Sequence, residues 1–290
     1  MVSKVEPSDE GSLSIDPERK DFDNVLKVDP SALWSQDEAS LYKRKARRLS
    51  KTEFFFSKKV GEALSSYNMI DENDKILVAL SGGESSFSLL KVLNFKRRNI
   101  PVKYQIKVCF IDTGYDDARR KEVEDYLKKN GFDYIIEKLN PKKIRAGKPT
   151  DCYWCAFSRY KRLFKVAAGQ GCSKIALGQH KDDMVEGFLD DLFFKGIVRR
   201  VTPKESFLRG RFQVIRPLVL CEKEFITQYS KASKFPTIER RCAGALTPRR
   251  RMMRDALGKV HKKNKDIKTN IFRSIDNINY DYLPKSQKAV

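Results

Sequence analysis

Two hydrophobic patterns alternate along the chain from residue 74 onward. Short apolar or alternating runs, typical of buried strands, occur at 75–80, 102–112, 134–136 and 173–177. Helical spacing of apolar residues separates these runs, from Phe87 to Phe95, from about Asp116 to Asn130, and after the segment around Cys152 through Ala168. Strands separated by helices of this length predict an α/β fold in which a parallel sheet is covered on both faces.

Further elements are predicted on either side of this core. Phe54 to Tyr67 has the spacing of a helix that packs on the body, and Gly131 stands where a helix C-cap would be. After residue 178 the pattern predicts a helix through Phe194, a strand-like hairpin within 206–220, a helix from Glu222 to Ser233, and a strongly basic helix from Pro248 to about Lys263.

Composition divides the chain into four segments. Residues 1–40 contain ten acidic and four basic residues with few apolar ones, which predicts a flexible acidic tail. Residues 41–72 are predicted to form basic N-terminal helices. Residues 73–235 hold the alternating strands and helices with a CxxC insertion, and 236–290 form a basic helical segment that contains Cys242.

The net charge of +21 and the pI near 9.7 indicate a polyanionic partner. Nucleic acid is favoured over an anionic membrane surface, because no basic amphipathic helix with a clean apolar face is apparent. A merely basic soluble protein is the plainer alternative. No apolar run approaches the ~20 residues of a membrane span, and the N-terminus lacks the apolar core of a signal peptide, so we expect a cytoplasmic protein without a membrane partner.

The first candidate site is a serine- and glycine-rich loop between a predicted strand and the start of a helix. It consists of Ser81, Gly82, Gly83, Glu84, Ser85 and Ser86. Adjacent glycines let the backbone approach a ligand closely, and N–H groups at a helix N-terminus attract anions. The loop matches neither a Walker motif nor the dinucleotide motif. It predicts a phosphate or pyrophosphate site, and the alternative is an ordinary turn with serine caps.

The second candidate site is the CxxC pair Cys152 and Cys155 at the beginning of a predicted helix. Two thiolates at this spacing can bind one metal centre, and a helix N-terminus lowers thiol pKa. A redox pair, a zinc site with remote ligands and a three-cysteine iron–sulfur cluster all remain open. Cys242, in a polar loop, is the best candidate for a third ligand. For Cys109, Cys172 and Cys221 we expect burial in the core.

The third candidate site is GQHKDD, residues 178–183, after the fourth strand. In a parallel sheet this segment and the phosphate loop face one crevice. A carboxylate there could hold Mg²⁺ against phosphates. One aspartate is expected only to cap the helix, and Asp183 is predicted to be the functional one. Gly178 lies at the strand end, and His180 could contact phosphate or a reacting base.

In this order, SGGESS, CxxC, KIALGQHKDDMVEGFL and VIRPL resemble the tRNA 2-thiocytidine synthetases (TtcA-like proteins) of the PP-loop ATP pyrophosphatase superfamily. The likeness extends from roughly Leu41 to Leu257. It implies a Rossmann-like PP-loop fold of the adenine nucleotide alpha hydrolase type. It also implies tRNA as partner, ATP and Mg²⁺, and a 4Fe–4S cluster.

The resemblance also implies residue roles. ATP phosphates would bind at Ser81, Gly82, Gly83 and Ser86, with Glu84, Ser85, Gly178 and His180 beside them. Asp112 would contact the nucleoside, and Asp183 would assist Mg²⁺. Cys152, Cys155 and Cys242 would hold the cluster, so that Cys152, Cys155 and Asp183 form the catalytic set. Basic residues would bind RNA phosphates: Arg44, Arg47, Arg48, Arg249, Arg250, Arg251 and Arg254.

The activity so implied is adenylation of C2–O of an anticodon-loop cytidine, followed by sulfur transfer from a cysteine desulfurase or from sulfide. A homodimer is plausible. Two alternatives remain open. One is a tRNA-binding partner that has lost turnover, because Ser85 stands where the family loop has aspartate. The other is a 2-thiouridine synthetase.

Overall fold

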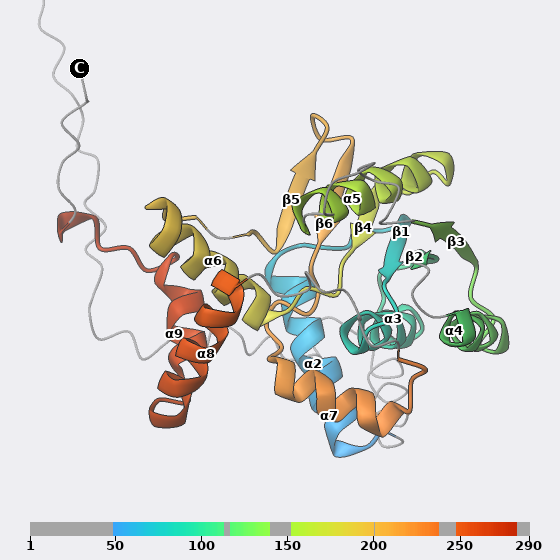
Figure 1. The fold of residues 1–290 in the computed structure, drawn as a ribbon. Coiled ribbons are helices and arrows are strands. Elements are labelled where there is room, and N and C mark those ends of the chain that lie inside the picture. The colour runs from blue at the N-terminus through green and yellow to red at the C-terminus, as the bar shows by residue number, and fades with distance from the viewer. Residues whose placement is uncertain (1–48, 113–116, 140–151, 200, 238–247, 283–290) are drawn as a thin grey trace, which may run out of the picture. The chain divides into compact units, whose positions relative to one another are not determined.

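A six-stranded sheet forms the centre of the computed structural model, which describes residues 49–282 except 113–116, 140–151, 200 and 238–247 (Figure 1). The strands are β1 (Asp74–Leu80), β2 (Tyr104–Asp112), β3 (Tyr134–Lys138), β4 (Lys174–Ala176), β5 (Lys204–Phe207) and β6 (Phe212–Ile215). They lie in the order β3-β2-β1-β4-β6-β5. All neighbours are parallel except β5 and β6, which form an antiparallel hairpin. The predicted mostly parallel sheet and the hairpin are confirmed.

The helices also lie where the sequence patterns place them, within a few residues. They are α2 (Lys51–Ser66), α3 (Glu84–Arg97), α4 (Asp117–Lys129), α5 (Cys152–Gly169), α6 (Lys181–Lys195), α7 (Lys223–Ser233) and α8 (Pro248–Lys263). A capping box between Ser50 and Glu53 starts α2. Gly131 has φ +65°, as expected of a residue that ends a helix. Two short elements were not predicted: α9 (Ile267–Ser274) and the 3₁₀ turn η4 (Tyr280–Tyr282).

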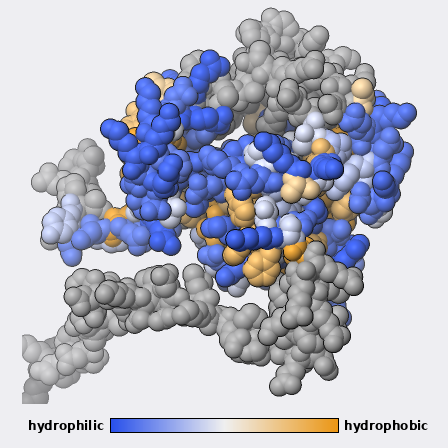
Figure 2. Space-filling view, turned by 90° about the horizontal axis from the view of Figure 1, so that it is seen from below, coloured by the Kyte–Doolittle hydropathy of each residue, from blue (hydrophilic) through white to orange (hydrophobic). Residues whose placement is uncertain are grey.

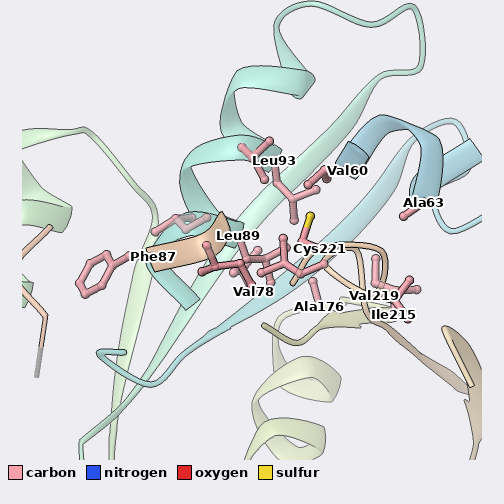
Figure 3. Close-up of a cluster of buried hydrophobic side chains, with 14 of the residues drawn as sticks. Val60, Ala63, Val78, Phe87, Leu89, Leu93, Ala176, Ile215, Val219 and Cys221 are labelled. Carbon is pink, nitrogen blue, oxygen red and sulfur yellow. The ribbon is translucent and has the colours of Figure 1, made fainter. Parts of the chain in front are cut away.

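Alternate residues of β1 face two separate hydrophobic clusters. Ile76, Val78 and Leu80 lie in the larger cluster, together with side chains from α2, α3, α4, α6 and α7, part of which Figure 3 shows. Leu77 lies in the smaller cluster with side chains of α5. Helices therefore cover both faces of the sheet, and α5 lies on the opposite face from α3 and α7 (Figure 1). This period-2 alternation is what a strand buried on both sides requires.

The two C-terminal helices, α8 and α9, are attached to the rest of the protein through α6. Both α8 and α9 pack against α6 and against each other. Leu257 of α8 and Phe272 of α9 are buried in the larger cluster, so these basic helices are part of the same packed body. All described residues belong to one compact unit that begins at Leu49. The proposed division at residues 40, 72 and 235 stays a prediction, and the expected tail lies outside the described residues.

The described surface is predominantly hydrophilic on the face in Figure 2, with hydrophobic side chains showing between the polar ones. No helix in the described part of the chain has both the length and the apolar character needed to cross a membrane.

Candidate functional site

The strand order places the phosphate loop, Asp112 and residues 178–183 at one edge of the sheet. From β1 the chain crosses to β2 on one side, while β4 pairs with β1 on the other. Because these strands are parallel, the residues that follow Leu80, Asp112 and Ala176 all leave the same edge. A crevice at such a reversal of strand order is where ligands bind in open α/β sheets.

The phosphate loop is shaped by its two glycines. Gly82 has φ +80°, a left-handed conformation that glycine adopts without strain. Gly83 is the N-cap of α3, and no side chain provides a capping hydrogen bond. The first N–H groups of a helix lack intrahelical acceptors. These donors therefore fit an anionic ligand, which is what the sequence predicts for this loop.

The hydroxyl of Ser86 holds the loop in shape. It donates to the carbonyl of Gly83 at 2.8 Å and accepts from the N–H of Ser81 at 3.2 Å. The Ser81 and Ser86 hydroxyl oxygens are 3.4 Å apart. Ser86 is buried, so its hydrogen bonds close the turn from inside. The geometry thus gives Ser86 a role in positioning the backbone donors.

Glu84 points to α7. Its carboxylate lies 2.7 Å from Nζ of Lys223 and accepts from the hydroxyl of Thr227 at 3.0 Å. Burial raises the pKa of Glu84, but the hydrogen bond and charge of Lys223 outweigh it, so the net pKa is lowered. Glu84 is therefore an ionised anchor between the phosphate loop and α7.

Gly178 brings the end of β4 into contact with the phosphate loop. A Cβ at this position would lie 3.0 Å from the carbonyl carbon of Ser85 and 3.1 Å from the backbone nitrogen of Ser86. These atoms belong to the backbone of the first turn of α3 and cannot move aside independently. Glycine at 178 is what allows the two predicted segments to meet.

Asp183 caps α6, and His180 lies beside both aspartates. The carboxylate of Asp183 accepts from the backbone N–H of His180 at 3.0 Å, and it lies 3.4 Å from Nε2 of the same residue. His180 is buried, and its Nδ1 lies 3.5 Å from Asp182. One aspartate caps the helix, as expected, but it is Asp183, which was predicted to be the functional one, and not Asp182. Its side chain is still 36% exposed, so a cation could reach it.

Asp182 joins three helices. One of its oxygens lies 2.7 Å from Nζ of Lys268 on α9, and the other accepts from the backbone N–H of Lys223 on α7 at 2.8 Å. Burial raises its pKa, whereas the His180 ring, Lys268 and the Lys223 N–H together hold the pKa well below its usual range. Asp182 is therefore an ionised junction of α6, α7 and α9.

Arg216 is a site residue that the sequence reasoning did not single out, although it lies in the quoted VIRPL motif. It is 2% exposed. Its guanidinium donates to the side-chain oxygen of Gln179 at 2.7 Å, to the carbonyl of Thr202 at 2.6 Å and to Glu205 at 3.0 Å. Buried Arg216 thereby fixes the segment that follows β4. A polar residue inside an apolar run was the signal that could have identified it.

Asp112 ends β2 and is buried, 3.5 Å from the guanidinium of Arg120. The strand predicted over 102–112 therefore ends where the sequence pattern placed its end. Its predicted contact with a nucleoside stays a prediction.

Three of the cysteines are buried in the core, as the sequence predicts. Cys109, Cys172 and Cys221 are buried and free, and burial raises the pKa of each thiol, to about 12 for Cys109 and Cys221. Cys152 and Cys155 lie in the first turn of α5. Their side chains and all of Cys242 lie outside the described residues. The ligand set of the predicted cluster therefore stays a prediction.

The predicted RNA-binding arginines differ in their contacts. Arg254 makes two hydrogen bonds to the carboxylate of Glu186 on α6, at 2.8 and 2.9 Å. Arg249 is exposed and lies over the ring of Phe194, 4.8 Å from its centre, while Arg251 is exposed. The side chain of Arg250 and all of Arg44, Arg47 and Arg48 lie outside the described residues.

Comparisons with family models, curated proteins and solved structures each find proteins that are similar to this chain. Residues 53–260 match the PP-loop domain family. A tRNA-cytidine(32) 2-sulfurtransferase from Geotalea daltonii is 33% identical over 252 residues, which cover 85% of this chain and 96% of that protein. The protein of the same name from Geobacter sulfurreducens is 35% identical over 77% of this chain and 90% of its own. Among solved structures, the U34-tRNA thiolase NcsA from Methanococcus maripaludis, with its 4Fe–4S cluster, is similar. It has a TM-score of 0.65 and 16% identity over 82% of each chain, which supports the fold alone.

Proposed function

Because this chain belongs to the PP-loop family together with the tRNA-cytidine(32) 2-sulfurtransferases, we propose that it is an ATP-dependent tRNA sulfurtransferase that acts on a cytidine. The observation that carries the proposal is the 33–35% identity to these relatives over most of both chains. The uncapped N–H groups of α3 and the close approach of Gly178 fit the ATP phosphates that such a reaction needs.

The proposed reaction has two displacements. The C2 oxygen of the base attacks the α-phosphorus of ATP, the bond to the β-phosphate oxygen breaks, and pyrophosphate leaves. A sulfur nucleophile then attacks C2, and the C2–O bond breaks as AMP departs with the oxygen. The backbone donors after Gly83 would bind the phosphates that carry the developing negative charge. A base in a paired stack is not accessible to such attack, so the tRNA must present it unstacked.

We assign the remaining site residues as follows. Asp183 would hold Mg²⁺ against the phosphates, because its carboxylate is partly exposed and lies at the same sheet edge as the phosphate loop. Asp112 would contact the nucleoside from the end of β2. His180 would contact phosphate or the reacting base.

The donor chemistry of the cysteines fits a cluster. Cys152 and Cys155 are three residues apart in the sequence, a spacing at which two thiolates can bind one metal centre. With Cys242 they would supply three thiolates. A 4Fe–4S cluster with three protein ligands has one open iron, which would supply a binding position for sulfide. The three cysteines would bind iron as thiolates, and a position at a helix N-terminus favours the thiolate form.

The sulfur would come from a cysteine desulfurase or from free sulfide, and two chains would form a homodimer. Because the proposed substrate is tRNA, we place the reaction in the cytoplasm. Size-exclusion chromatography with light scattering tests the dimer.

The deciding experiment combines metal analysis with activity. Protein purified without oxygen is assayed for iron, zinc and acid-labile sulfide, and then incubated with ATP, sulfide and tRNA, whose nucleosides are analysed by mass spectrometry. We expect one cluster per chain and 2-thiocytidine, both lost in Cys152→Ala. The matched control is Cys172→Ala, a buried thiol of the smaller hydrophobic cluster, which should retain the cluster. Zinc alone, or unmodified tRNA in the presence of an active control enzyme, would contradict the proposal.

A second candidate rests on Ser85 and Glu84. Ser85 provides no carboxylate in the loop, and the carboxylate of Glu84 is bound to Lys223 and Thr227. A tRNA-binding subunit without ATP turnover would have such a loop. In that case the protein would form no AMP, and Ser85→Asp would restore AMP formation. Robust AMP formation by the unchanged protein would exclude this candidate.

A further inference from the structure

The C-terminal end of α6 exposes an unusual number of apolar side chains. Phe193 is 64% exposed, Val198 is 62% and Ile197 is 44%; Phe194 and Val201, at 36% and 37%, are also exposed. They occur within nine residues that end α6 and lead to β5. We call these five residues the α6 apolar patch. Several large apolar side chains exposed together mark an interaction surface more often than scattered single ones do.

Asp191 holds this segment against the last turn of α6. Its carbonyl accepts from the backbone N–H groups of Gly196 and Ile197, and Gly196 adopts the left-handed conformation that ends the helix. Its carboxylate binds Lys195 and, at 3.0 Å, Arg199. The exposed rings and methyl groups are thus presented by hydrogen-bonded backbone.

Cations surround the patch. Arg249, at the start of α8, lies over the ring of Phe194 with its guanidinium 4.8 Å from the ring centre. Arg199 is 65% exposed. Helix α8, which packs on α6, has seven lysines and arginines and one aspartate. Aromatic rings with arginine occur both at protein interfaces and on surfaces that bind unpaired nucleotides. The seven cations and one aspartate of α8 favour the polyanionic nucleic acid.

We propose that the α6 apolar patch and Arg249 form a stacking platform for two unpaired nucleotides of the RNA substrate. A base stacks on the exposed ring of Phe193, and a second stacks on the guanidinium that already covers Phe194. This inference rests on the proposed function, because the reacting base belongs at the opposite end of α6. From Asp183 to Phe194 the helix rises about 17 Å, so the stacked nucleotides lie a few positions along the strand from the reacting one.

The test compares two RNA probes across single substitutions. One probe is a stem–loop with a seven-nucleotide loop, and the other is a fully paired RNA duplex of the same charge. We expect Phe193→Ala and Phe194→Ala each to weaken stem–loop binding by roughly tenfold and to change duplex binding less than about twofold. The slope of log affinity against log salt should not change, because stacking releases no counterions. Leu208→Ala, at a similarly exposed apolar residue in the β5–β6 turn, is the control and should bind as the wild type does.

Two outcomes overturn the platform. One is unchanged stem–loop affinity in both phenylalanine variants. The other is conversion of a dimer to a monomer by Phe193→Ala with RNA affinity per chain unchanged, which would assign the patch to a second copy of the chain. A thiolation assay on the same samples separates this inference from the proposed function. If the wild type forms no thiolated nucleoside while the variants still lose stem–loop affinity, the function fails and the platform stands.

Discussion

A substitution of Gly178 by alanine, which adds one methyl group, tests whether the phosphate loop binds ATP. Its Cβ would meet the backbone of Ser85 and Ser86 at 3.0–3.1 Å, closer than a carbon normally approaches, so the phosphate loop would have to shift. We expect Gly178→Ala to weaken ATP binding by on the order of tenfold, because displaced donors no longer face the phosphates. Isothermal titration calorimetry with ATP measures this effect.

The matched control is Gly187→Ala in the middle of α6, where an added Cβ meets nothing within 4 Å. Alanine is a better helix former than glycine, so this variant should be more stable by roughly 0.5–1 kcal/mol and bind ATP normally. Normal ATP binding by Gly178→Ala would show that the phosphates are bound elsewhere.

Lys96 is a buried cation whose charge opposes folding. It is 5% exposed, and its ammonium occupies the space that Gly61 leaves, where a Cβ would lie 2.7 Å away. Burial lowers the pKa of Lys96 to about 8, from 10.5. A lysine whose folded pKa is lowered destabilises the protein fully below that pKa. The cost disappears as pH rises from about 8 to 10.5.

We therefore expect Lys96→Met to raise the free energy of unfolding at pH 7 by up to roughly 3 kcal/mol. The gain over wild type should shrink between pH 8 and 10. The difference in free energy of unfolding between the variant and the wild type cancels the titration of tyrosines and cysteines, because both proteins contain the same ones. Urea unfolding at four pH values provides the measurement, with exposed Lys103→Met as control. A difference that does not vary with pH would refute the buried charge.

At the scale of elements, the buried cation of Lys268 links α9 to the candidate site. Nζ of Lys268 lies 2.7 Å from Asp182 and 3.2 Å from both oxygens of Glu224, and the side chain is 7% exposed. Its removal leaves neighbouring carboxylates without their cation. We expect Lys268→Met to cost about 3 kcal/mol of unfolding free energy at pH 7 and to increase hydrogen exchange in α9.

The pH dependence of that loss has a definite sign. In the wild type the pKa of Asp182 is lowered, so its stabilising contribution is present above the unfolded value of 3.8 and is lost as pH falls below it. In Lys268→Met the carboxylates repel and protonate more readily. The stability deficit should therefore stay constant above about pH 4 and shrink as pH falls below it. Exposed Lys265→Met is the control, and an equal loss there would point to a general charge effect.

The elements that the sequence predicted are those with a local cause. β1 contains a continuous apolar run from Ile76 to Leu80, α2 has the Ser50–Glu53 capping box, and α4 is followed by Gly131 at positive φ. α9 was not predicted because eight residues give too few turns for a period, and its stability comes from Phe272 and Lys268 packing on distant helices. Local motifs are visible in a sequence, whereas contacts between distant residues are not. The sequence therefore predicted the separate segments of the candidate site. The Lys223–Glu84 and Arg216–Gln179 contacts, which join residues over 100 and 37 positions apart, were not predicted.

At the scale of the whole molecule, a net charge of +21 predicts RNA binding that depends steeply on salt. Which cations contribute depends on what each already contacts. Arg251 is exposed at the start of α8, whereas Arg254 on the same helix donates from Nε and Nη2 to the two carboxylate oxygens of Glu186. The carboxylate of Glu186 already balances the charge of Arg254, so a phosphate gains less from this arginine than from Arg251.

We therefore expect Arg251→Gln to reduce the salt slope of tRNA binding by about 0.7–0.9, the value for one lost phosphate contact. Arg254→Gln should leave the slope unchanged and instead reduce the thermal stability, because Glu186 is buried and loses its partner. Both variants remove one positive charge, so they are matched in net charge. The salt slope of tRNA affinity, measured between about 50 and 200 mM salt, distinguishes the effect of Arg251 from that of Arg254. Equal slopes for both variants would mean that only the net charge matters. A lower slope for Arg254→Gln alone would mean that the Glu186 pair opens when tRNA binds.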